Sequence, residues 1–413
     1  MSKDKKNVIW NMLGASANAF NSLLFAIVVT RVNGVNEAGI FTYSFATACL
    51  FYMIAVYAGR TFQVTDITGK NSDSDYIYHR IITCIIMILV SIIFVLVKQY
   101  DIYKSSIFVI LCIFKCVEAF SESIYAIIQK NDSLYKVGIS LFLKAVISII
   151  TFTISNYITK NLLISCISIV LVNIILLIIY DFRNMKKLEF VKTKLSKKSM
   201  MQIFKIGFFT FLLTFLGNYL INAPRYAIDD ILTNDLQTIF GIIIMPATLM
   251  GLLGQYIIQP CLVGISNSIK NKKYKELRKT IIKLASIIIG FGCVVIIGAY
   301  LLEQKVLELV YGVDLSMHIT SMMIIVVGSI LYSLSTILSA LLIAMRKTKI
   351  QAYMYIIVAI IATILSYNLV NKIQIVGASI TYLLTMLLIT VLFTVYITYC
   401  MRIYKKEWKE HID

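Results

Sequence analysis

Charged residues and proline are scarce in this chain. Of its 413 residues, 15% are Asp, Glu, Lys or Arg and only three are proline, while 59% are hydrophobic. Soluble globular domains carry about 25% charged and about 45–50% apolar residues. The composition therefore excludes an ordinary soluble protein.

Long apolar runs account for this imbalance. Each of twelve windows of at least 17 mostly apolar residues is long enough to cross a hydrocarbon core about 30 Å thick as a helix. Lipid satisfies no backbone polar group, and uninterrupted apolar runs exclude the strands of a barrel. We predict an all-α polytopic membrane protein with twelve transmembrane helices. The expected spans are 8–30, 37–59, 81–97, 104–128, 137–155, 161–180, 201–223, 238–264, 281–302, 319–345, 350–370 and 376–400.

Metal ligands and disulfide pairs are also lacking. All eight cysteines lie inside the expected spans, where they act as small apolar residues. The three histidines fall in loops or in the C-terminal tail, and no pair has the spacing of metal ligands. We therefore expect no metal and no cofactor.

Positive charge is in large excess, with a formal net charge of +18. By our count, 28 of the 39 Lys and Arg fall in the N-terminal tail, in loops after even-numbered spans and in the C-terminal tail. Because basic loops are retained in the cytoplasm, this distribution places both termini there. The charge is thus explained by topology and by attraction to anionic lipid, and we expect no nucleic-acid partner.

A basic connector at 181–200 divides the chain into two halves of six spans. We expect an N-terminal lobe at 1–180, a C-terminal lobe at 201–400 and a cytoplasmic tail at 401–413. In both halves an Asn-bearing first helix precedes an Arg at its outer end, Asn18 and Arg31 in one and Asn218 and Arg225 in the other. An even number of spans in each half predicts parallel repeats, and transporters commonly bind substrate at such repeat interfaces.

Three charges share one face of the fourth span: Lys115, Glu118 and Glu122. Each is costly at membrane depth, so this face is expected to point into the bundle. The cluster either neutralises itself and holds neighbouring helices, or forms a site. In a site, Lys115 contacts substrate while Glu118 or Glu122 titrates against an ion.

A polar stripe runs along the fifth span through Ser140, Lys144 and Ser148. We favour the wall of a water-lined cavity with Lys144 as its charge, although polar residues also join membrane helices. Lys115 and Lys144, with Arg31, Arg225 and Arg60, give the interior a cationic excess. Since Arg binds phosphate with two parallel donors, we expect an anionic, amphipathic substrate and not a cationic drug.

Several segments resemble the repeat-unit flippases of bacterial O-antigen and capsule assembly. These flippases are polysaccharide transporters of the multidrug/oligosaccharidyl-lipid/polysaccharide exporter (MOP) superfamily. The segments that carry the likeness are Asn11-Met12-Leu13-Gly14 with Asn18, Val29-Thr30-Arg31, Glu37-Ala38-Gly39-Ile40-Phe41, residues 57–66, the stretch holding Glu118, Gln129, Gly138, Ser140 and Lys144, and, more faintly, Pro224-Arg225-Tyr226.

The resemblance implies a V-shaped, MATE-like bundle of two six-helix lobes in the bacterial cytoplasmic membrane. By alternating access it would move undecaprenyl-diphosphate-linked oligosaccharide from the inner to the outer leaflet. The buried cations, with Asn18, Asn218, Ser140 and Ser148, would face the headgroup. Analogy with antiporting relatives implies coupling to an H⁺ or Na⁺ gradient through Glu118 or Glu122, and polysaccharide polymerase machinery is the implied partner. Lys144 stands where an Arg is commoner in the family.

Two other functions compete with this one. A cation-coupled multidrug exporter of the same superfamily needs a lobe whose buried charge is acidic and unpaired, whereas Lys115 accompanies Glu118 and Glu122 here. A membrane enzyme such as a polysaccharide polymerase needs a large outside loop for its catalytic residues, and the outside loops are short. We therefore expect a transporter and not an enzyme.

Overall fold

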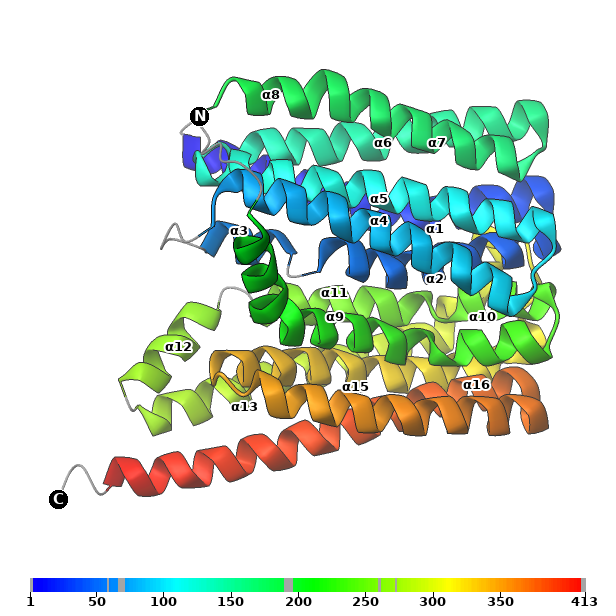
Figure 1. The fold of residues 1–413 in the computed structure, drawn as a ribbon. Coiled ribbons are helices and arrows are strands. Elements are labelled where there is room, and N and C mark those ends of the chain that lie inside the picture. Colours follow the sequence, from blue (N-terminus) through cyan, green and yellow to red (C-terminus); the bar gives the residue numbers. More distant parts are fainter. Residues whose placement is uncertain are drawn as a thin grey trace. The chain divides into compact units, whose positions relative to one another are not determined.

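The computed structural model describes residues 3–57, 59–65, 71–188, 196–258, 261–271 and 273–409. Within these ranges the chain forms helices and their connections, so the expected all-α fold class is confirmed (Figure 1). The chain divides into two compact units, residues 1–215 and 216–413, each described here by itself. Residues 189–195 of the expected connector and 410–413 of the expected tail lie outside the described ranges.

The first unit is a bundle of long helices that run alongside one another (Figure 1). Its elements are α1 (Lys3–Asn33), α2 (Val35–Val56), α3 (Gly59–Thr65), α4 (Asp73–Lys98), α5 (Ile102–Lys130), α6 (Leu134–Thr159), α7 (Leu162–Leu176), a π-helical segment (Leu177–Phe182), α8 (Arg183–Lys186) and the first part of α9 (Lys197–Ile231).

Polar residues start three of these helices. Ser72 and Asp75 form a capping box at the start of α4. The Asp101 side chain accepts from two backbone N–H groups of α5, and Asn161 does the same for α7. Each cap satisfies donors that a helix leaves open at its N-terminus, so short polar sequences between apolar runs define where these helices begin.

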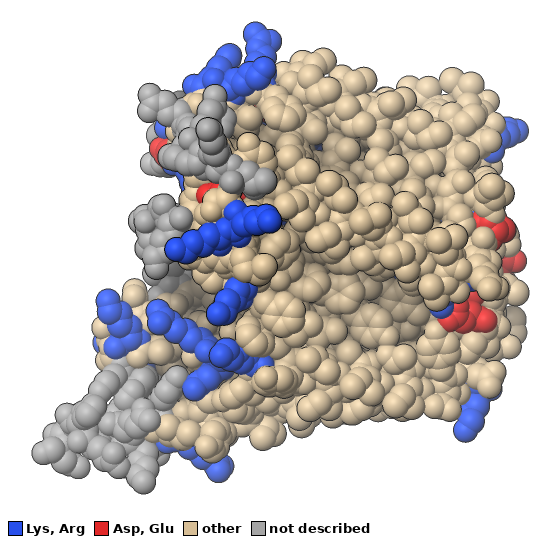
Figure 2. All heavy atoms as spheres, in the orientation of Figure 1, with Lys and Arg blue, Asp and Glu red and all other residues tan. Residues whose placement is uncertain are grey.

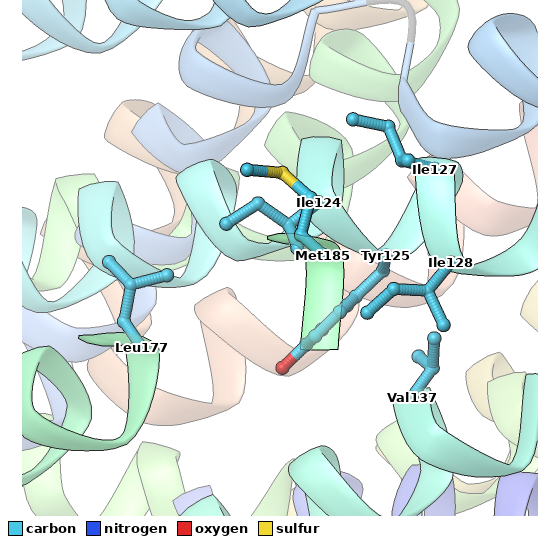
Figure 3. Packing of buried hydrophobic residues seen from close by; sticks show 7 residues of the cluster. All are labelled: Ile124, Tyr125, Ile127, Ile128, Val137, Leu177 and Met185. Atoms are coloured by element: carbon cyan, nitrogen blue, oxygen red, sulfur yellow. The ribbon is translucent and has the colours of Figure 1, made fainter. Parts of the chain in front are cut away.

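The interior of the first unit is close-packed. Helix α1 packs mainly against α6, and α2 against α5. Gly14 and Gly138 allow the first of these contacts, because a Cβ on Gly138 would lie 2.2 Å from the carbonyl carbon of Trp10. An apolar cluster joins α5 to α6, to the π-helical segment and to α8 (Figure 3). Its members are Ile124, Tyr125, Ile127, Ile128, Val137, Leu177 and Met185.

The second unit contains the rest of α9 and the remaining helices. These are α10 (Asn234–Ile243), α11 (Met245–Ile258), α12 (Leu262–Lys270), α13 (Tyr274–Gly298), a π-helical segment (Ala299–Glu303), α14 (Gln304–Tyr311), a 3₁₀ turn (Ser316–His318), α15 (Ile319–Ala344) and α16 (Thr348–Lys409). Helix α16 is broken at Ile373 and Gln374, where the backbone leaves the helical region. Helix α15 packs mainly against α16 and α11.

The helices expose apolar flanks. Leu96, Val97, Ile154 and Ile178 are 69%, 75%, 54% and 58% exposed. In Figure 2 the visible Lys and Arg lie mainly over helix ends and connections, whereas the long flanks are uncharged. Such flanks suit contact with lipid hydrocarbon, as expected of a membrane protein.

Ten helical stretches of the described residues are long and apolar enough to cross a membrane. One of them, 348–403, contains the break in α16 and so comprises two spans. Helix α5 is 29 residues long but carries Lys115, Glu118 and Glu122 within its apolar sequence. When α5 is included and α16 is divided, the described residues contain the twelve expected spans.

The contact between α1 and α6 can be tested at Gly138. We expect Gly138→Ala to destabilise the protein by about 1–3 kcal/mol, because the added methyl group meets backbone atoms that cannot move aside. The matched control is Gly298→Ala in α13, where a Cβ meets nothing within 4 Å. Thermal unfolding in detergent should show a lower midpoint for the first variant only. Equal midpoints for the two variants would contradict the proposed close contact.

Candidate functional site

A small polar cavity lies inside the first unit. Its volume is about 30 Å³, room for one or two water molecules. It is lined by Asn18, Tyr52, Glu118, Ser121, Glu122, Tyr125, Leu141 and Lys144. Helices α1, α5 and α6 thus bring together four of the residues singled out in the sequence: Asn18, Glu118, Glu122 and Lys144.

Lys144 is held by a buried carboxylate, Asp181. The lysine Nζ lies 2.6 Å from Asp181 Oδ2 and 2.6 Å from Ser121 Oγ. Ser140 donates to Asp181 Oδ1 at 2.5 Å, and the hydroxyls of Ser140 and Tyr125 lie 2.8 Å apart. Asp181 is fully buried and Lys144 is 5% exposed. Both charges are therefore satisfied within this lobe by each other and by hydroxyl groups.

Asp181 is not among the residues expected from the sequence, because the sixth span was expected to end at residue 180 and residue 181 to belong to the basic connector. In the structure the π-helical segment Leu177–Phe182 continues the helix through Asp181. Single π-helical turns within α-helices often occur at functional sites. One signal in the sequence could have pointed to Asp181. The apolar residues continue past it to Phe182, which indicates that the helix does not end at residue 180.

The two glutamates that line the cavity each have a basic partner. Lys115 Nζ lies 2.5 Å from Glu118 Oε2, with side chains 12% and 16% exposed. The same amine stands 4.7 Å from the centre of the Phe45 ring. The partner of Glu122 comes from another helix: Arg60 Nε of α3 lies 3.7 Å from Glu122 Oε2 of α5. Two carboxylates therefore line the cavity, and each has a basic partner that is not itself among the lining residues.

The polar stripe of the fifth span has two roles. Of Ser140, Lys144 and Ser148, only Lys144 lines this cavity. Ser148 is buried and accepts a hydrogen bond from Asn173 Nδ2 at 2.8 Å, which joins α6 to α7. Ser140 joins α6 to the π-helical segment through Asp181. Most of the stripe thus links helices, and one member reaches the cavity.

The remaining residues expected at the site are Arg31 in the first unit and Arg225 and Asn218 in the second. Arg31 is exposed near the end of α1. In the second unit Arg225 is buried, with its guanidinium 5.9 Å from the centre of the Phe240 ring. The Asn218 carbonyl accepts from Asn222 Nδ2 at 2.9 Å. Arg31 is not among the residues that line the polar cavity of the first unit.

One comparison links the sequence to capsule synthesis. The chain is 24% identical over 383 residues to the capsular polysaccharide biosynthesis protein CapF of Staphylococcus aureus. The aligned region covers 91% of this chain and 94% of that protein. No protein-family model matches the chain.

Solved structures share the fold. A multidrug resistance MATE family transporter of the MOP superfamily, in its inward-facing conformation, aligns with a TM-score of 0.72 at 11% identity over 96% of this chain and 99% of its own. A eukaryotic MATE transporter aligns with a TM-score of 0.64 at 13% identity over 100% and 99% of the two chains. The chain therefore has the fold of these MATE transporters. Its similarity to a capsular polysaccharide biosynthesis protein is consistent with the resemblance stated from the sequence.

The Lys144–Asp181 pair allows a sharp stability test. We expect Asp181→Asn to destabilise the protein by roughly 3–5 kcal/mol, because Lys144 is left buried without a counter-ion. The double variant Asp181→Asn/Lys144→Met removes both charges and should recover most of that loss. The measurement is the yield of monodisperse protein and its unfolding midpoint in detergent.

The control is Glu276→Gln, which breaks the exposed Lys273–Glu276 pair, whose side chains are 54% and 59% exposed. Exposed pairs contribute about 0–1 kcal/mol, so this variant should unfold close to the wild type. If Asp181→Asn is as mild as Glu276→Gln, or if the double variant is no better than the single one, the buried pair does not have the role assigned to it.

Proposed function

We propose that this protein is a flippase for undecaprenyl-diphosphate-linked oligosaccharide. In this proposal it carries repeat units by alternating access from the inner to the outer leaflet of a bacterial cytoplasmic membrane. Both termini then lie in the cytoplasm, and a polysaccharide polymerase uses the product. The observation that carries the proposal is the charged interior of a helix bundle whose flanks are apolar, in a chain similar to a capsule biosynthesis protein.

The physical argument concerns an amphipathic substrate. An undecaprenyl-diphosphate-linked oligosaccharide has a polyprenyl hydrocarbon tail that dissolves in the bilayer and a charged, hydrated headgroup that does not. Apolar flanks leave the tail in lipid, while a polar interior replaces the water that the headgroup loses. Short helix connections leave no soluble domain in which catalysis could be built, which favours a transporter over a polymerase.

The ion pairs also bear on the choice of substrate. A cationic drug is bound most favourably by a carboxylate with no other partner. Here Glu118 pairs with Lys115, and Glu122 lies beside Arg60. Both acidic groups of the cavity already have a basic partner, which disfavours a cationic drug and leaves an anionic headgroup as the better match.

The cavity of about 30 Å³ is too small for a sugar. We therefore propose it as the place where a coupling ion acts, and not as the chamber for the headgroup. It offers the carboxylates of Glu118 and Glu122, the Asn18 amide and room for water. A proton or Na⁺ that neutralised either glutamate would release Lys115 or Arg60 from its partner, which would link ion binding to the charge facing the substrate.

Transport can be measured in proteoliposomes that contain a prenyl-diphosphate oligosaccharide with a fluorescent sugar. A membrane-impermeant quencher reaches only label in the outer leaflet, so the purified protein should increase the quenched fraction toward completion. Empty liposomes provide the baseline, and a permanently cationic dye tests the drug-exporter alternative. No increase in quenching, or transport of the dye in its place, would refute the proposed substrate.

Ion coupling predicts a separate result. The wild-type rate of quenching should rise when an H⁺ or Na⁺ gradient is imposed across the vesicle membrane. Glu122→Gln and Glu118→Gln should lose that acceleration, because an amide cannot titrate or offer a full charge to a cation. Glu276→Gln, at an exposed carboxylate of the second unit, should keep it. A wild-type rate that ignores both gradients would exclude the coupling role.

A further inference from the structure

Arg80 is a buried basic side chain of the first unit that donates a hydrogen bond to a backbone carbonyl group. It lies on α4 and is 4% exposed. Its Nη1 donates to the backbone carbonyl of Ala55, which also accepts from Thr83 Oγ1 at 2.6 Å. No carboxylate of the described residues forms a salt bridge with it, whereas Lys115, Lys144 and Arg60 each have one.

The position of Arg80 explains how it tolerates burial. Ala55 lies in the last turn of α2, which ends at Val56. The open carbonyl groups at a helix C-terminus carry a partial negative charge of about half an electron. This stabilises the guanidinium without neutralising it.

Arg80 and Arg60 also hold donors that lack acceptors. In the described part of the chain, Arg80 Nε and Arg60 Nη1 are buried and have no hydrogen-bond partner. Arg60 meets Glu122 at 3.7 Å, a distance beyond that of a hydrogen bond. Glu122 lines the polar cavity together with Tyr52 of α2, and Tyr52 lies one helical turn before Ala55, the acceptor for Arg80. The two guanidinium groups therefore share one neighbourhood.

From these observations we propose that Arg60 and Arg80 form a binding site for a phosphate or diphosphate group. Buried donors without acceptors are rare because they are costly, and a ligand with several acceptor oxygens would satisfy them. Two planar guanidinium forks suit tetrahedral phosphate oxygens better than they suit a single ion. The excess positive charge selects an anion. Lys115 and Lys144, expected to contact the diphosphate, are instead occupied by Glu118 and Asp181.

The source of the phosphate is either a lipid headgroup or a free anion. If the proposed function is correct, this site holds the diphosphate of the lipid-linked substrate within the first unit. Free inorganic diphosphate would present the same oxygens. The two sources differ in the hydrocarbon tail, so binding can be compared with and without one.

The test measures binding of inorganic diphosphate and of farnesyl diphosphate to the purified full-length protein by titration calorimetry. We expect Arg80→Gln and Arg60→Gln each to weaken binding at least tenfold. Arg80→Lys keeps the charge but loses the fork, and should lie between Arg80→Gln and the wild type. The control is Arg346→Gln, the same change at an exposed arginine, which should bind as the wild type does.

Equal affinity for both probes with the same arginine dependence identifies the phosphate group itself as the ligand, and binding of farnesyl diphosphate alone identifies a lipid headgroup. If no variant at Arg60 or Arg80 weakens binding of either probe, or if Arg346→Gln weakens it as much, the site is refuted. Should Arg80→Gln yield no monodisperse protein, Arg80→Lys and Arg60→Gln decide the matter.

The proteoliposome measurement separates this inference from the proposed function. Wild-type protein that binds diphosphate through Arg60 and Arg80 but moves no lipid-linked oligosaccharide would leave the site standing and refute the function. Wild-type protein that moves the lipid, together with Arg60→Gln and Arg80→Lys variants that bind and transport unchanged, would refute the site alone.

Discussion

The structure depends on how ionised side chains are kept inside an apolar helix bundle. A single charge at the centre of a membrane helix costs roughly 2.5–3.5 kcal/mol on insertion scales. In the first unit this cost is met by pairing across short distances, with Lys144 and Asp181 at 2.6 Å and Lys115 and Glu118 at 2.5 Å. Helix positions in this unit are therefore constrained by charge geometry as well as by apolar packing.

Local structure provides that geometry. The π-helical segment at Leu177–Phe182 carries Asp181 into the bundle, opposite Lys144 of α6. Tyr125 belongs to the apolar cluster of Figure 3, and its hydroxyl also bonds to Ser140, which in turn donates to Asp181. Apolar packing and the polar network thus share a residue, so a disturbance of one is transmitted to the other.

Much of the fold, and part of the site, followed from the sequence. The apolar runs predicted the all-α membrane fold, and helical spacing placed Lys115 and Glu118 on one face of α5, where they pair. Such signals are local, because a helix determines which of its own residues share a face. Asp181 and Arg80 were missed because their roles depend on contacts between helices. The partner of Lys144 lies 37 residues away, and the acceptor for Arg80 is a backbone carbonyl that no side-chain pattern reveals.

The incomplete compensation of charge is informative about mechanism. A lobe that served only as scaffold would gain by neutralising every buried cation, or by replacing ion pairs with apolar residues, since such replacements are often neutral or stabilising. Here Lys115, Lys144 and Arg60 have carboxylates within 4 Å, while Arg80 has a helix C-terminus and a donor with no acceptor. Two carboxylates of the paired set line a water-sized cavity where an ion can reach them. If an ion acts at these glutamates and a phosphate group binds at Arg60 and Arg80, as we propose, the two events alter the same charge balance in opposite directions. Under this proposal, coupling between ion and substrate needs no contact between them, because both would act on the charge of one low-dielectric lobe.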